Sequence, residues 1–217
     1  MVEPPRGQHG LRDPVAEPLM AGADQPVRRS FGLAGRPLGP EGAPCVETEL
    51  ARDPFWRLLE FRAEAGAARP ALLLVAPLSG HFAFLARELA AELAAGFRVL
   101  VADWANPRHV PVSAGVFDLD ANLAAVLRMM RAAGPGAACV GLCQGGVAAL
   151  AAAALLAAEG DPATPEALAL IAAPIDPRAA PTRIATMLAA SSEAWFRAAA
   201  AREVGAAHAG RGRAVYP

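Results

Sequence analysis

A cysteine flanked by glycines is the residue of this sequence best suited to covalent chemistry. An apolar run, Ala138-Cys139-Val140, leads into Gly141-Leu142-Cys143-Gln144-Gly145, and an alanine-rich stretch follows. This order predicts a strand, a sharp turn and a helix, which is the arrangement of a nucleophile elbow with cysteine in the usual place of serine. A lone Gly-x-Cys-x-Gly also arises by chance, and buried cysteines are commonly small core residues. The prediction therefore depends on the elements around the motif.

The spacing of the motif has a physical reason. A nucleophile at the apex of a tight turn holds strained backbone angles. We expect Gly141 and Gly145 to flank it because a Cβ at either position would collide across the turn. The helix that begins near Gly145 directs its N–H groups and positive dipole end at Cys143, which favours the thiolate.

The elements that must position Cys143 alternate between strand and helix. Helices are predicted over Phe82–Ala95 and Leu119–Ala133, and after the elbow to about Ala158. The run Asp53–Arg62 could be a helix or a strand, and its alternation favours a strand. Apolar runs predict four parallel strands, of which the first two are expected to be buried: Ala71–Ala76, Val99–Ala102, Ala137–Leu142 and Ala167–Ala172. This pattern predicts an α/β fold of the α/β-hydrolase type, a parallel sheet with helices on both faces.

The chain divides into three predicted parts. Residues 1–44 are rich in proline, glycine and arginine and are expected to form a disordered or extended tail. Residues 45–178 are expected to form the N-terminal part of the hydrolase domain, with the sheet incomplete at its C-terminal side. Residues 179–217 are expected to contain a helix over Thr182–Ala201 and a frayed end, which could begin a cap region.

Composition limits the class of protein. The chain has 217 residues, 54% of them hydrophobic, and a net charge of -1, which argues for a globular domain and against a nucleic-acid binder. Three cysteines make a disulfide framework unexpected. No signal peptide is visible, and Val147–Ala158 is shorter than the roughly 20 residues that span a bilayer. We expect a cytoplasmic protein without a membrane span, and neither a cofactor nor a metal.

Several stretches between Phe55 and Leu188 together resemble one family, the intracellular polyhydroxyalkanoate (polyhydroxybutyrate) depolymerases. Three segments carry this resemblance: Leu74–Phe82, Asp103–Asp120, and Ala173-Pro174-Ile175-Asp176 with Pro181-Thr182. The chain departs from the family at Gly145, where depolymerases often have proline, and over its first 45 residues. Members of the family are also longer, so the resemblance implies a C-terminally truncated member that lacks the catalytic acid and histidine.

The resemblance implies hydrolysis of the ester bonds of intracellular poly(3-hydroxyalkanoate), with release of 3-hydroxy acids. Cys143 would attack the ester carbonyl and form an acyl-enzyme. The N–H of Gln144 and an N–H of the loop after the first parallel strand would hold the oxyanion, with Leu78 preferred to Ser79 as the second donor. The polymer or the granule surface is the implied partner, so the cytoplasmic protein could be granule-associated.

The identities of the general base and acid stay open. His81, in the oxyanion loop, could approach Cys143, although a loop-stabilising role is preferred. Asp176 lies at the carboxyl edge of the sheet, where sites form in open α/β folds, although a turn cap before Pro177 is preferred. Two other functions also stay open: a polyhydroxyalkanoate synthase-like acyltransferase, and a non-catalytic granule-binding fragment.

Overall fold

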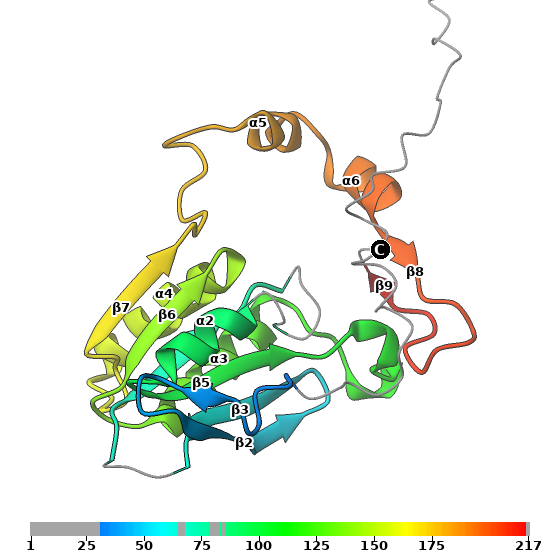
Figure 1. The fold of residues 1–217 in the computed structure, drawn as a ribbon. Helices are drawn as coiled ribbons and strands as arrows, with labels where there is room; N and C mark the ends of the chain where they lie inside the picture. The colour runs from blue at the N-terminus through cyan, green and yellow to red at the C-terminus, as the bar shows by residue number, and fades with distance from the viewer. Residues whose placement is uncertain (1–30, 65–67, 79–82, 84–85, 216–217) are drawn as a thin grey trace, which may run out of the picture.

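The computed structural model of the chain describes residues 31–64, 68–78, 83 and 86–215. Among these residues, seven strands form one sheet (Figure 1). Their spatial order is β1 (Pro37–Leu38), β2 (Ala43–Asp53), β3 (Trp56–Ala63), β5 (Arg98–Trp104), β4 (Ala71–Val75), β6 (Ala138–Leu142) and β7 (Ala167–Ile171). The strands β5, β4, β6 and β7 run parallel, while β1, β2 and β3 form an antiparallel edge. The four predicted parallel strands are therefore confirmed, and so is the strand within Asp53–Arg62.

The helices follow the parallel strands as the alternation predicts. Helix α2 (Arg87–Leu93) connects β4 to β5, α3 (Leu119–Ala133) connects β5 to β6, and α4 (Gln144–Glu159) connects β6 to β7. Helix α3 begins at Asp118, whose carboxylate accepts a hydrogen bond from the Ala121 N–H at 2.9 Å, and ends at Gly134. Such a cap satisfies a backbone donor that the first turn leaves free.

The core lies where β4 and β5 meet the helices. The apolar runs Leu72–Val75 and Val99–Ala102 are buried, as expected for central parallel strands covered on both faces. Helix α3 contributes Val126, Met129 and Met130 from one face. Helix α4 is only partly buried, because Val147 and Leu155 are exposed.

The predicted tail over residues 1–44 is wrong for residues 31–44, which are the part of it that the structure describes, because these residues are folded. Phe31, Leu33 and Leu38 are buried, and the Phe31 ring packs on Phe61 with centroids 5.1 Å apart. Strand β2 was not predicted, because Cys45 is its only buried side chain and it has no apolar run. Its pairing with β3 rather than its own side chains makes it a strand.

The segment after β7 also differs from the prediction. The single helix expected over Thr182–Ala201 is two helices, α5 (Arg183–Ala189) and α6 (Glu193–Ala200). Ser192 separates them, since its hydroxyl caps α6 by accepting a hydrogen bond from the Trp195 N–H at 3.1 Å. The predicted helix over Phe82–Ala95 begins only at Arg87 among the described residues.

The C-terminal part of the described chain returns to the loop that follows β5. Strands β8 (Arg202–Glu203) and β9 (Ala214–Val215) form a small antiparallel sheet. The loop after β5 contains two short 3-10 helices, η2 (Pro107–His109) and η3 (Val112–Ala114). The Gly210 N–H donates to the Arg108 carbonyl at 2.7 Å, so β8 and β9 lie beside this loop (Figure 1).

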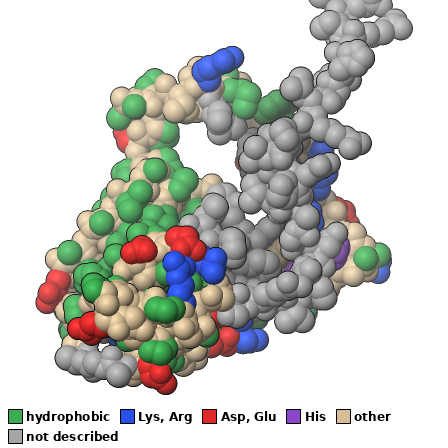
Figure 2. Space-filling model, viewed as in Figure 1, with side chains coloured by type: hydrophobic (Ala, Val, Ile, Leu, Met, Phe, Trp, Pro, Cys, Tyr) green, Lys and Arg blue, Asp and Glu red, His purple; other side chains and the backbone are tan. Residues whose placement is uncertain are grey.

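Hydrophobic side chains lie along the edge of the sheet at β7, as Figure 2 shows. Leu170 and Ile171 are exposed on this strand, and Val147 and Leu155 are exposed on α4. None of the helices in the described part of the chain reaches the length and apolarity that a bilayer crossing requires.

Candidate active site

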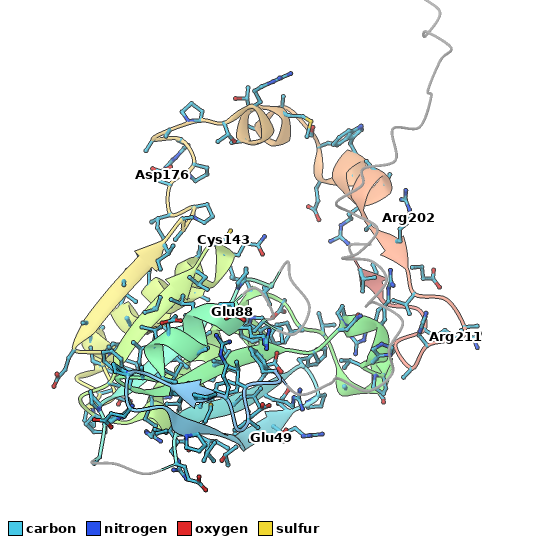
Figure 3. All side chains as sticks on the ribbon, viewed as in Figure 1. Glu49, Glu88, Cys143, Asp176, Arg202 and Arg211 are labelled. Atoms are coloured by element: carbon cyan, nitrogen blue, oxygen red, sulfur yellow. The ribbon has the colours of Figure 1, made fainter. Side chains whose placement is uncertain are left out.

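Cys143 occupies the turn between β6 and α4 with a strained backbone. Its φ of 49° and ψ of -124° lie outside the regions that non-glycine residues ordinarily adopt. Its N–H donates to the Ile171 carbonyl at 2.8 Å, and its own carbonyl accepts from the Gly146 N–H at 3.0 Å. The side chain is exposed. The turn therefore presents the sulfur at the carboxyl edge of the sheet, as labelled in Figure 3.

The glycines around Cys143 permit close backbone contacts. A Cβ on Gly141 would overlap the Cα of Gly146. A Cβ on Gly145 would overlap the Val75 carbonyl and lie 2.7 Å from the carbonyl oxygen of Ala76. A larger residue at position 145 would separate the elbow from the end of β4, and one at position 141 would separate β6 from the start of α4, because these contacts are with backbone atoms that cannot rotate away.

The contact at Gly145 brings the loop after β4 to the start of α4. Ala76 and Pro77 of this loop are buried, and Leu78 is exposed. The N–H of Gln144 belongs to the first residue of α4, where backbone donors have no partner within the helix. The two predicted oxyanion donors therefore belong to segments that touch through Gly145. The alternative donor Ser79 and the candidate base His81 lie outside the described residues.

Asp176 lies on the connection between β7 and α5 (Figure 3). Its Oδ1 accepts from the Arg178 Nε at 2.8 Å and from the Arg178 N–H at 3.0 Å, and its Oδ2 accepts from Nη2 at 3.1 Å. The guanidinium and the backbone N–H of Arg178 hold the pKa of Asp176 below its ordinary value. These contacts are those of a turn cap, and Asp176 is exposed.

Two histidines that are distant in the sequence meet in the fold. The rings of His109 and His208 are 5.8 Å apart and nearly perpendicular. Both lie where the C-terminal segment meets the loop after β5. Within the described part of the chain, no group of three or more His, Cys, Asp or Glu residues could hold a metal ion.

The sequence also did not predict the partners of Asp103 and Trp104 at the end of β5. The Oδ2 of Asp103 accepts from the Arg57 Nη2 of β3 at 3.2 Å. The Trp104 indole N–H donates to the Ala76 carbonyl at 2.8 Å. Neither contact has a local sequence signal, because each joins strands separated by about 30 to 50 residues.

The strand order and the strained turn between β6 and α4 define an α/β-hydrolase fold. No family model and no curated protein matches the chain. Solved structures do resemble it. Esterase Est22 overlaps it with a TM-score of 0.44 and 16% identity, covering 73% of this chain and 51% of that chain.

Two further solved structures overlap more weakly. Brefeldin A esterase, described as a bacterial homologue of human hormone sensitive lipase, has a TM-score of 0.39 and 19% identity, covering 71% of this chain and 45% of its own. A mutant of the N-acyl homoserine lactonase AidH, complexed with N-hexanoyl homoserine, has a TM-score of 0.39 and 19% identity, covering 60% and 46%. The chain spans about half the length of these structures. The assignment of the fold rests on the strand order and the turn rather than on these overlaps.

Proposed function

We propose that this chain carries the nucleophile of a carboxylic ester hydrolase and that the nucleophile is Cys143. The observation that supports this most directly is the backbone of Cys143, a non-glycine residue held at φ 49° with its side chain exposed. Such strain costs roughly 1–3 kcal/mol and is concentrated at functional sites. Cys139, four residues earlier in the same segment, is buried and extended in β6, as a core cysteine would be.

The reaction begins with attack of the Cys143 sulfur on the ester carbonyl carbon. The new S–C bond places negative charge on the carbonyl oxygen, which accepts hydrogen bonds from the N–H groups of Gln144 and Leu78. Collapse of this intermediate breaks the ester C–O bond, and the alkoxide takes a proton. Water then hydrolyses the thioester and releases the acid. The general base and acid for these proton transfers stay open: a loop-stabilising role is preferred for His81, and Asp176 has the contacts of a turn cap.

The proposed substrate is an intracellular poly(3-hydroxyalkanoate). This proposal rests on the resemblance of Leu74–Phe82, Asp103–Asp120 and Ala173–Asp176 to the depolymerase family. The partner is then the polymer or the granule surface, and the protein is cytoplasmic and granule-associated.

A first-turnover experiment tests the nucleophile. With p-nitrophenyl butyrate the leaving group needs no proton, so a burst of p-nitrophenolate reports acylation alone. We expect a burst equal to the protein concentration in the wild type and in Cys139→Ser, and no burst in Cys143→Ala. An undiminished burst in Cys143→Ala would refute Cys143 as the nucleophile.

A second assay tests the substrate. Release of free 3-hydroxy acid from amorphous polymer by the wild type, lost in Cys143→Ala, would support the depolymerase function. Polymer growth from a hydroxyacyl-coenzyme A would instead support the acyltransferase, and polymer binding that is unchanged in Cys143→Ala without any burst would support a binding fragment. We expect little hydrolysis after the burst. If turnover is sustained and is lost in His81→Ala, His81 is the general base, since such catalysis contributes about 10²–10⁴-fold.

A further inference from the structure

We propose that Trp104 positions the loop that donates the Leu78 N–H and thereby controls the rate at which Cys143 is acylated. The inference rests on the proposed function, because it concerns the same oxyanion site. Trp104 itself is 3% exposed and lies in the core, so it is a positioning residue rather than a catalytic one.

The hydrogen bond of Trp104 joins the ends of two neighbouring strands. Trp104 is the last residue of β5, and Ala76 is the first residue after β4. The indole Nε1 donates to the Ala76 carbonyl oxygen at 2.8 Å, and Ala76 is fully buried. A buried carbonyl that loses its donor carries a desolvation cost, so this bond strongly favours one orientation of the Ala76 peptide.

The same carbonyl also faces the elbow. A Cβ on Gly145 would lie 2.7 Å from the Ala76 oxygen. The oxygen therefore lies between the indole of Trp104 and the first turn of α4. Rotation of the peptide that follows Ala76 would disturb both contacts.

Pro77 transmits this orientation to Leu78. Its ring restricts its own φ to about -65° and restricts the conformation of Ala76 before it. Pro77 has no N–H, so the next backbone donor after the fixed carbonyl is that of Leu78. With the Ala76 carbonyl held by Trp104 and the next φ held by the Pro77 ring, the ψ of Pro77 is the one backbone torsion left between this carbonyl and the Leu78 N–H.

The indole is itself held by an aromatic stack. Phe117 lies 5.8 Å from Trp104 between ring centroids, and Phe55 stacks on Phe117 at 5.0 Å. The guanidinium of Arg213 lies 5.0 Å above the Phe55 ring. These contacts restrict the indole to the rotamer that reaches Ala76.

Trp56 offers a matched control within the same sheet. It pairs with Trp104 across β3 and β5 and is also buried, at 4% exposure. Its Nε1 is buried without a hydrogen-bond partner in the part of the chain that the structure describes. Replacement of Trp56 by phenylalanine therefore removes an indole N–H but no described hydrogen bond.

The test compares two reactions of the Cys143 sulfur in Trp104→Phe and Trp56→Phe. Acylation by p-nitrophenyl butyrate develops an oxyanion, whereas alkylation by iodoacetamide displaces iodide and develops none. We expect Trp104→Phe to lower the burst rate constant by about 10-fold or more, since small misplacements at reacting groups have large effects on rate. We expect its alkylation rate to stay within about twofold of the wild type, and Trp56→Phe to change neither rate.

Three outcomes would overturn the inference. An unchanged burst rate in Trp104→Phe excludes a positioning role. If the rates of acylation and alkylation fall equally, Trp104 stabilises the fold as a whole and does not specifically position the Leu78 N–H. A wild type without a burst, although Cys143 is alkylated, overturns the proposed function and this inference with it. If Trp104→Phe loses its far-ultraviolet circular dichroism spectrum, the same rates are measured with benzothienylalanine at position 104, which keeps the ring shape without the N–H.

Discussion

At the scale of the residue, backbone strain is found at the proposed nucleophile. Cys143 and Ala172 are non-glycine residues at positive φ, and both directly follow strands of the sheet. They are linked, because the Cys143 N–H donates to Ile171, the residue before Ala172. Strain at two neighbouring strand ends is expected where a site, rather than packing, determines the backbone.

The cysteines should differ sharply in reactivity. Cys143 is exposed, whereas burial raises the pKa of the Cys139 thiol to about 12. At pH 7.5 Cys139 is therefore almost wholly protonated, and only the thiolate reacts. We expect iodoacetamide to label Cys143 at least about 100-fold faster than Cys139, measured by mass spectrometry of the peptides. Cys45 is a control, since its thiol is buried and burial raises its pKa. Equal labelling of all three in the folded protein would contradict the elbow.

At the scale of the element, the helices that flank the elbow strand are joined by an ion pair. Arg131 of α3 donates from Nε to Asp161 at 2.8 Å, and from Nη2 to Glu159 at 3.1 Å. Asp161 follows the C-terminus of α4 and also accepts from the Ala163 N–H at 2.9 Å. The pair therefore fixes the end of α4 against α3, and the start of α4 holds Cys143.

This ion pair should make stability depend on pH in the acid range. The Ala163 N–H and then the Arg131 guanidinium lower the pKa of Asp161 in the folded chain. A lowered folded pKa contributes stability above the unfolded pKa, and this contribution is lost as pH falls through the folded value. In urea unfolding we expect Asp161→Asn to have a lower midpoint than the wild type at pH 7, with the difference gone in acid.

The control for this experiment is Glu41→Gln, which removes an exposed carboxylate in the turn between β1 and β2. Its midpoint should follow the wild type at each pH. A difference between Asp161→Asn and the wild type that stays constant down to pH 2 would show that the ion pair is not its cause.

At the scale of the whole molecule, one arginine holds the C-terminal segment against the loop after β5. Arg213 donates to the carbonyls of Val110 at 2.6 Å, of Gly115 at 2.8 Å and of Pro111, and lies over Phe55. The connection through α5 and α6 is thus attached at both ends, to β7 and to this loop (Figure 1). A planar guanidinium can bind several carbonyls at once, which an ammonium cannot match.

We expect Arg213→Lys to release residues 202–215 from the loop while the sheet stays folded. Hydrogen exchange followed by mass spectrometry should show faster exchange over 202–215 and over 107–115, with exchange in β4 and β5 unchanged. Arg211→Lys, at an exposed position two residues earlier, is the control and should leave the pattern of the wild type. Unchanged protection of 202–215 in Arg213→Lys would show that other contacts hold the segment.

Local patterns in the sequence determined most of the α/β core. The predicted runs within β4 to β7 contain no charged residue, and α3 has both an N-cap residue and a terminating glycine. The motif around Cys143 also predicts its own turn, since Gly141 and Gly145 are needed wherever backbone approaches that closely. Such features depend on neighbours within a few residues, so they can be derived from the order of the residues.

Only the tertiary structure decided the edge strand β2, the break between α5 and α6, and the contacts between distant residues. Strand β2 has few buried side chains, so only its pairing with β3 identifies it. The break between α5 and α6 depends on the hydroxyl of Ser192, which an apolar periodicity does not detect. The bonds from Trp104 to Ala76 and from Arg213 to Val110 span 28 and 103 residues. Which distant groups meet is determined by the packing of the whole sheet, because no local preference of either residue specifies its partner.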